Sequence, residues 1–198
     1  MNLAPRMTLI DEPLPGVKIL RPFVFEDSRG NFVKPFHEGQ LADHRIVMTV
    51  REEFFSTSAV GVLRGMHFQV PPHAHQKLVY CLTGRVLDVV LDLRRGSLTF
   101  GRAAGFELSA ANRHVLHIPI GFAHGFLSLD PASCLVYKTD AVHNPDCDRG
   151  IRWDSFGFDW TRQQSSQAVT PTISNRDAEH PSFAEFTSPF EDLGTANE

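Results

Sequence analysis

The chain has 198 residues, 42% of them hydrophobic and 21% charged, with three cysteines and a net charge of −4. A chain of this length can bury a sizeable core without staples, and three cysteines with no Cys-x-x-Cys pair favour a reducing cytoplasm over a disulfide framework or a thiolate zinc site. The acidic balance and the lack of long basic or apolar runs exclude nucleic-acid-binding and membrane-spanning classes, so we expect a cytoplasmic protein with neither kind of partner.

Short apolar segments separated by turn residues recur through the chain from about residue 17 to residue 160. Helical periodicity is weak everywhere except over Glu38–Asp43. The clearest strand covers residues 86–93, where leucine and valine side chains alternate with Asp88 and Asp92 on the opposite face. Many short strands at this spacing predict an all-β fold, an antiparallel sandwich or barrel, in one domain over residues 1–198 with a core at about 17–177.

After residue 160 the apolar density falls and serine, threonine, proline and acidic residues take over. This change predicts loops or short helices that wrap the strands. The last residues, 194–198, are expected to be disordered.

Two of the ten histidines stand in segments that would present them to a site. His67 follows Gly65, which allows the backbone to bend or bulge within a strand and re-aim its neighbours. His124 follows a turn formed by Pro119 and Gly121, which leads into the next strand.

Ten short segments, in this order along the chain, carry a family resemblance. They are DSRG (27–30), VLRGMHFQ (62–69), QKLV (76–79), GRVLDV (84–89), RRGSLTFG (94–101), ELSAAN (107–112), IPIGFAHGF (118–126), VYKT (136–139), GIRWD (150–154) and SNRD (174–177). In them the sequence resembles the dTDP-4-dehydrorhamnose 3,5-epimerase family. The resemblance implies a cupin-type jelly roll and a cofactor-independent epimerase that inverts C3, C5 or both carbons of a nucleotide-linked 4-keto-6-deoxy sugar.

Inversion beside a ketone needs a base for the α-proton, a group that stabilises the enolate oxygen, and an acid on the opposite face. By resemblance His67 is the base, and Asp177 fixes its tautomer and stabilises the imidazolium. A histidine suits this role because an imidazole is largely neutral at cell pH. Lys77 would face the oxyanion at C4, and Tyr137 would be the opposing acid.

The resemblance also implies a set of substrate-binding residues for a nucleotide-diphosphate sugar. The planar fork of arginine suits a diphosphate, and Arg29 is expected to reach the site from a second subunit, which predicts a homodimer. The expected binding residues are Arg29, Glu52, Arg64, His124, Asp148 and Arg176.

Three other functions remain open at this point. The segment from Pro119 to His124 matches the second metal motif of cupins, and His73-Ala74-His75 offers a pair of ligands for a metal-dependent cupin enzyme, although the glutamate expected after that pair is missing. A 3,4-ketoisomerase and a non-catalytic sugar-binding jelly roll share the fold. No Gly-rich phosphate-binding loop is present, so we expect no organic cofactor, and the preferred interpretation includes no metal.

The sequence departs from the family where ligand contacts are expected. Residues 52–56 read Glu-Glu-Phe-Phe-Ser, where members that use dTDP usually carry Gln-acid-Asn-His-Ser. Lys34 replaces a usual glutamate, Val142-His143 replaces an aromatic pair, and His73 and His75 are also unusual. Since Gln and Asn both donate and accept hydrogen bonds while Glu only accepts, we expect a preferred substrate that differs from dTDP-4-keto-6-deoxyglucose in its base or sugar. Whether C3, C5 or both are inverted stays open.

Overall fold

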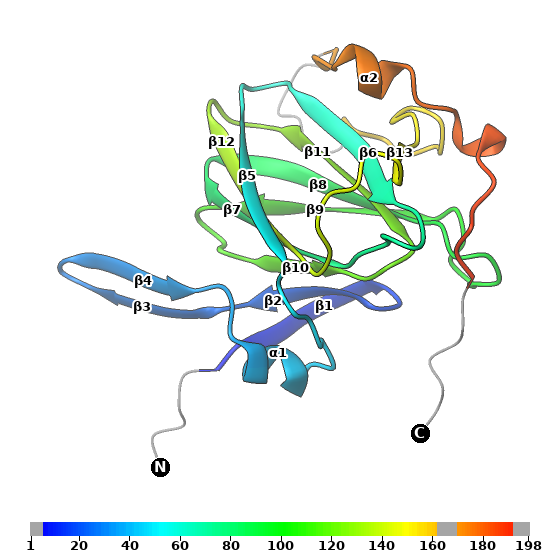
Figure 1. Ribbon diagram of the computed structural model, residues 1–198. Coiled ribbons are helices and arrows are strands. Elements are labelled where there is room, and N and C mark those ends of the chain that lie inside the picture. Colours follow the sequence, from blue (N-terminus) through cyan, green and yellow to red (C-terminus); the bar gives the residue numbers. More distant parts are fainter. Residues whose placement is uncertain (1–5, 162–169, 192–198) are drawn as a thin grey trace.

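A computed structural model describes residues 6–161 and 170–191 of the chain, and strands dominate it (Figure 1). The first sheet is antiparallel and contains, in spatial order, β1 (Thr8–Leu14), β2 (Val17–Arg21), β10 (Val115–Ile118), β7 (Lys77–Thr83), β12 (Ser133–Thr139) and β5 (Glu52–Ser58). The second contains β13 (Asp148–Gly150), β6 (Leu63–Gln69), β11 (Phe122–Ser128), β8 (Arg85–Asp92) and β9 (Ala103–Ser109). The predicted all-β sandwich is confirmed.

A hairpin stands apart from both sheets. Strands β3 (Phe23–Asp27) and β4 (Gly30–Lys34) pair only with each other, and the hairpin projects away from the sandwich in Figure 1. Phe25 and Phe32 face each other across it, and each is about half exposed, at 51% and 55%. Large apolar side chains on an isolated two-stranded ribbon are typical of a surface that another protein covers.

The core lies between the two sheets. Side chains such as Val79, Leu116 and Leu135 from the six-stranded sheet pack there against Val90 and Phe126 from the five-stranded sheet. Burial of apolar area from both sheets supplies most of the stability of such a sandwich.

Strand β8 is buried on both faces. The predicted alternation is present, with Leu87, Val89 and Leu91 on the outer face of their sheet, where Trp160 and Phe190 cover them. The opposite face, which carries Asp88, looks into the sandwich, and its carboxylate is fully buried.

Short helices occur where the sequence predicts them. Helix α1 (Glu38–Asp43) buries Leu41 against the six-stranded sheet, in the one segment whose periodicity favours a helix. After β13 the chain wraps the five-stranded sheet and forms α2 (Asn175–Ala178) and a 3₁₀ helix, η1 (Phe183–Glu185). Residues 194–198, predicted to be disordered, lie outside the described ranges. None of the described helices combines the length and apolarity that crossing a membrane requires.

The bend expected at Gly65 is present. Gly65 has φ +124°, and a Cβ built on it would lie 2.5 Å from the Cα of Gly125 on β11, so only glycine fits this crossing. The pairing of β6 with β11 slips at this point, which places His67 directly opposite His124.

Candidate active site

A cavity of about 700 Å³ lies between the sheets. Nine of the ten predicted site residues line it: Glu52, Arg64, His67, Lys77, His124, Tyr137, Asp148, Arg176 and Asp177. They come from strands β5, β6, β7, β11, β12 and β13 and from helix α2, so only the folded sandwich brings them together.

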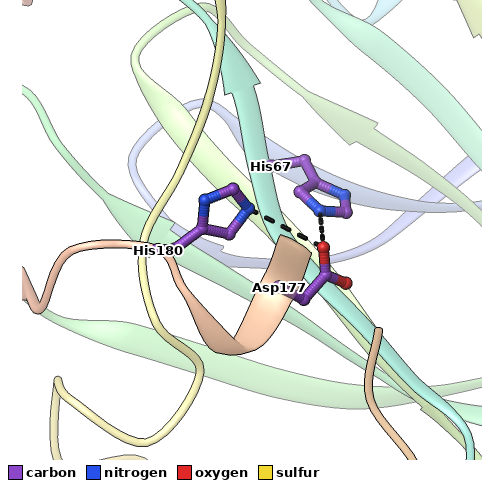
Figure 2. A group of neighbouring side chains, drawn as sticks. All are labelled: His67, Asp177 and His180. Carbon is purple, nitrogen blue, oxygen red and sulfur yellow. Dashed lines mark hydrogen bonds and ion pairs between the residues drawn. The ribbon is translucent and has the colours of Figure 1, made fainter. Parts of the chain in front are cut away.

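His67 and Asp177 form a hydrogen-bonded pair at one wall of the cavity (Figure 2). The Nε2 atom of His67 lies 2.8 Å from the Oδ1 atom of Asp177. The His67 side chain is 30% exposed, whereas the Asp177 side chain is almost wholly buried. A half-buried imidazole anchored by a buried carboxylate is an arrangement suited to proton transfer.

The fold holds Asp177 in its ionised form. Ser174 caps the N-terminus of α2 and accepts from the backbone N–H of Asp177, while the N–H of Gly65 donates to Asp177 Oδ2 at 3.0 Å. Burial alone would raise the pKa of Asp177, but the hydrogen bonds from His67 and Gly65 and the neighbouring imidazole charge outweigh it and lower the pKa to about 2. Since an ionised carboxylate only accepts, the His67 Nε2 atom carries the proton of this hydrogen bond.

Lys77 begins β7 and lies beside this pair. Its Nζ atom donates to the backbone carbonyl of His67 at 3.3 Å. Burial lowers the pKa of Lys77 to about 8, against the opposing influence of the Asp148 and Asp88 carboxylates. Lys77 is therefore mostly charged at neutral pH and close to losing its proton above it.

Tyr137 lies on β12 of the six-stranded sheet, whereas His67 lies on β6 of the five-stranded sheet. Its hydroxyl is 3.3 Å from the Ser56 hydroxyl, and its ring stacks on Phe54 at 4.7 Å between ring centres. Burial raises the pKa of Tyr137 well above the ordinary value, and the Ser56 hydrogen bond only partly offsets this. The phenol therefore keeps its proton unless a strong base lies against it.

His124 has a partner that the sequence reasoning missed. Both carboxylate oxygens of Asp88 lie 2.9 Å from His124 Nε2, and both side chains are buried. Burial raises the pKa of Asp88, and the contact with His124 opposes that shift. In the sequence Asp88 is an acidic residue between Leu87 and Val89 in the best-defined strand, but the alternation alone does not show that its face is buried.

Polar residues join several elements near Asp148. Asp148 Oδ2 accepts from Arg176 at 2.6 Å and lies 3.2 Å from His143 Nε2, while Glu52 accepts from the backbone N–H of His143 at 2.8 Å. Arg64 lines the same cavity and donates to the Ser58 hydroxyl. Arg64 and Arg176 thus bring two guanidinium groups to the cavity, as an anionic ligand requires.

Arg29 is the one predicted site residue that does not line the cavity. It lies at the tip of the β3–β4 hairpin, with 85% of its side chain exposed, and pairs with Asp27. Arg29 therefore does not reach the cavity of its own chain.

His180 lies next to the His67–Asp177 pair and was not selected from the sequence. It follows α2 and stands three residues after Asp177, with its Nε2 atom 3.7 Å from Asp177 Oδ1 (Figure 2). The spacing of three along a helical turn was the available signal. Burial, together with the charge of His67, lowers the pKa of His180.

The metal ligands expected for a metal-dependent cupin do not come together. Within residues 6–161 and 170–191, the ligand atoms of His73, His75 and His124 do not gather within 4.8 Å of one another. Gln69 donates to His75 Nδ1 instead, and burial together with the charge of Lys77 lowers the pKa of His75 to about 4. His124 is bound to Asp88.

Comparisons with known proteins agree with this geometry. A family model described as dTDP-4-dehydrorhamnose 3,5-epimerase matches residues 11–185. A dTDP-4-dehydrorhamnose 3,5-epimerase of Shigella flexneri is 39% identical, over 90% of this chain and 97% of the relative. The relative of the same name from Neisseria gonorrhoeae is 42% identical over 86% of this chain, which spans about half of that protein, 51%.

The fold of this chain is also similar to that of solved structures. A dTDP-6-deoxy-D-glucose-3,5-epimerase from Legionella pneumophila, crystallised with dTDP-4-keto-L-rhamnose, superposes with a TM-score of 0.84 at 32% identity. The match covers 92% of this chain and 95% of that chain. The predicted cupin-type jelly roll is confirmed by this likeness.

Proposed function

The chain belongs to the dTDP-4-dehydrorhamnose 3,5-epimerase family and is an isomerase-class epimerase, and from this premise we propose that His67, Lys77 and Tyr137 carry out the inversion within the cavity. The observation that carries the proposal is the placement of a carboxylate-anchored imidazole and a protonated phenol on two different sheets around one cavity. Epimerisation needs a proton removed from one face of a carbon and another delivered to the opposite face.

His67 removes the α-proton. Because its Nε2–H donates to ionised Asp177, the lone pair of the imidazole lies on Nδ1, and that atom is the base. The C–H bond electrons form a double bond between the α-carbon and the carbonyl carbon, the C=O π electrons move to the oxygen to give an enolate, and the proton joins Nδ1. Asp177 then stabilises the imidazolium that results.

Lys77 stabilises the enolate. A cationic ammonium in a buried site lowers the energy of a developing oxyanion much more than the same charge would in water. Its position at the start of β7, against the backbone of His67, brings this charge to the wall at which the proton is removed.

Tyr137 returns a proton from the six-stranded sheet. Its raised pKa means that it protonates only a strong base, and an enolate carbon is one. After this step the phenolate regains a proton and the imidazolium loses one, both by exchange with solvent, so the enzyme returns to its starting state.

The substrate class follows from the cavity and the comparisons. Arg64 and Arg176 supply charge for a diphosphate, and the Legionella relative holds a dTDP-linked 4-keto sugar. We therefore assign a nucleotide-diphosphate 4-keto-6-deoxy sugar to this cavity. Four of the unusual residues also line it: Glu52, Phe54, His75 and His143. An apolar Phe54 and an acceptor at Glu52 would meet a different ligand edge from the usual amide pair, so the nucleotide or sugar preferred here differs from that of dTDP-4-keto-6-deoxyglucose.

A homodimer completes the proposal. The projecting hairpin bears two exposed phenylalanines, and Arg29 lies at its tip away from its own cavity. Docking of the hairpin on a second copy would cover Phe25 and Phe32 and carry Arg29 towards a neighbour's ligand. A cytoplasmic location belongs to the same proposal, supported by the three free cysteines.

The test is solvent-proton exchange. The protein is incubated in deuterated water with a 4-keto-6-deoxy sugar linked to a nucleoside diphosphate, and nuclear magnetic resonance locates deuterium at C3 and C5. A His114→Ala variant is the control, because His114 lies in the turn before β10 and does not line the cavity. Incorporation with inversion supports the proposal. A folded protein that incorporates no label from any nucleotide-linked 4-keto sugar overturns it.

A further inference from the structure

The side chains of His67, Asp177 and His180 form a compact group of three metal-binding functions (Figure 2). One ligand atom from each residue lies within 4.8 Å of the other two, with separations of 2.8 Å from His67 Nε2 to Asp177 Oδ1 and 3.7 Å from His180 Nε2 to the same oxygen. A tetrahedral Zn²⁺ with bonds of about 2.0 Å holds its ligand atoms roughly 3.3 Å apart. Small side-chain rotations therefore suffice to surround an ion.

The position of His180 is unusual for a residue with a merely structural role. Its Nε2 atom is buried and has no hydrogen-bond partner among the described residues. Buried polar atoms are almost always hydrogen-bonded, so an unsatisfied one marks a site that a ligand can complete. The imidazole lies over the bare Cα of Gly150, where a Cβ would collide with Nε2. Gly150 on β13 pairs with His67 on β6. The contact with Gly150 therefore places the His180 imidazole beside His67.

We propose that His67, Asp177 and His180 bind a divalent transition-metal ion, best matched by Zn²⁺, and that the bound ion inhibits the enzyme. Two imidazoles and one carboxylate are a donor set that zinc accepts, and harder ions such as Mg²⁺ prefer oxygen alone. His67 and Asp177 line the cavity, and the His67 side chain is 30% exposed, so two of the three ligands border on space that an ion can enter.

Inhibition follows from the tautomer of His67. In the metal-free protein the proton lies on Nε2 and the lone pair on Nδ1. A metal at Nε2 needs the lone pair there, so a neutral imidazole must carry its proton on Nδ1, and the base is lost. The ion and α-proton removal therefore exclude each other. The inhibition rests on the proposed function, whereas the metal binding does not.

Binding is tested first, without substrate. The wild type, His180→Gln and His143→Gln are first treated with a chelator. One sample of each is dialysed to equilibrium against ZnCl₂ to measure the bound metal, and a second, metal-free sample is titrated with ZnCl₂ in a calorimeter to measure the affinity. The last variant is the matched control, because His143 and Asp148 form a separate histidine–carboxylate contact at the cavity. We expect one Zn²⁺ per chain, a loss of affinity of more than about tenfold in His180→Gln, and unchanged binding in His143→Gln. Equal affinity in the wild type and His180→Gln, or no saturable binding by the wild type, overturns the proposal.

A second measurement needs no variant. In ¹⁵N-histidine-labelled wild-type protein, Zn²⁺ is expected to shift the Nε2 resonances of His67 and His180 together, at one equivalent. Shifts confined to other histidines contradict the site even if His180→Gln fails to fold.

The inhibitory effect is tested by deuterium exchange with and without Zn²⁺, each protein being compared with its own metal-free rate. We expect Zn²⁺ to stop exchange by the wild type, a chelator to restore it, and His180→Gln to need more than about tenfold more Zn²⁺. Undiminished exchange by wild-type protein with Zn²⁺ bound contradicts the inhibition. If the metal-free protein shows no exchange at all, the proposed function fails, while dialysis and resonance still decide the metal site.

Discussion

His67 on β6 and Tyr137 on β12 line one cavity from two different sheets. Removal of the base should therefore have a different effect from removal of the acid. We expect His67→Ala to slow α-proton exchange by about 10²- to 10⁴-fold, because no enolate forms. Tyr137→Phe should retain exchange but lose inversion, since the enolate recaptures a proton on its original face. Deuterium incorporation and product stereochemistry, read by nuclear magnetic resonance, separate the two. Full epimerisation by folded His67→Ala would contradict the assignment.

The carboxylate of Asp177 should make stability depend on pH. Its pKa in the folded protein, about 2, lies below the ordinary value of 3.8, so its contribution is present above pH 4 and is lost as the pH falls towards 2. Asp177→Asn cannot titrate. We expect the wild type to exceed this variant by about 2 kcal/mol in free energy of unfolding at pH 7, with the difference shrinking between pH 4 and pH 2. Urea denaturation at several pH values measures it, and a pH-independent difference would count against the ionised carboxylate.

The charge of Lys77 should set an alkaline limit on the rate. Because burial lowers its pKa to about 8, the ammonium loses its proton as the pH rises through that value, and the enolate loses its stabilising charge. We expect kcat/KM to fall above pH 8. In Lys77→Arg the charge persists at all accessible pH values, so whatever activity remains should lack this limb. If kcat/KM of that variant falls above pH 8 as it does in the wild type, the fall belongs to another titrating group.

The placement of Arg29 predicts that two defective chains can repair each other. If Arg29 serves a neighbour's site, a mixture of Arg29→Ala and His67→Ala chains contains heterodimers with one intact site each. Equal mixing and random exchange should restore about a quarter of the wild-type activity. Sedimentation should show a species of twice the 22.2 kDa chain mass. No recovery on mixing, together with a fully active monomer, would refute the arrangement.

The altered cavity wall predicts a shifted substrate preference. Phe54 stacks on Tyr137 where an amide is usual, so a ligand group that relied on that amide loses a hydrogen bond, at a cost of about 1–3 kcal/mol. We expect kcat/KM to be highest for a sugar nucleotide other than dTDP-4-keto-6-deoxyglucose in a panel of dTDP, CDP, UDP and GDP 4-keto sugars. Phe54→Asn should move the preference towards the dTDP sugar. The hypothesis fails if that sugar is already the best substrate and is labelled at both carbons.

The strands and the bend at Gly65 could be read from the sequence because both depend on local patterns. Alternation of apolar residues marks β8, and a glycine before His67 marks the crossing. The burial of Asp88 could not be inferred in the same way. The face that carries Asp88 looks into the sandwich and is covered by the six-stranded sheet, while residues far away in the chain, such as Trp160 and Phe190, cover the opposite face.

The site was predicted through family motifs, so residues outside those motifs were not selected. His180 stands outside every quoted segment, and its spacing of three residues from Asp177 indicates a contact only once the fold shows a helical turn there. Arg29 belongs to a quoted segment, yet sequence alone does not say which cavity it approaches. The cavity that Arg29 approaches depends on the direction in which the β3–β4 hairpin projects, and tertiary structure sets that direction.

The partners in the pair of His67 and Asp177 are separated by 110 residues of chain. Asp177 arrives on the segment that also lays Phe186 and Phe190 over the five-stranded sheet. Local undocking of residues 170–191 would leave the sandwich standing while freeing the imidazole to change tautomer. The catalytic rate therefore depends on whether this segment is docked. A protease that cleaves the segment would abolish activity before spectroscopic measurements detect any loss of β-structure.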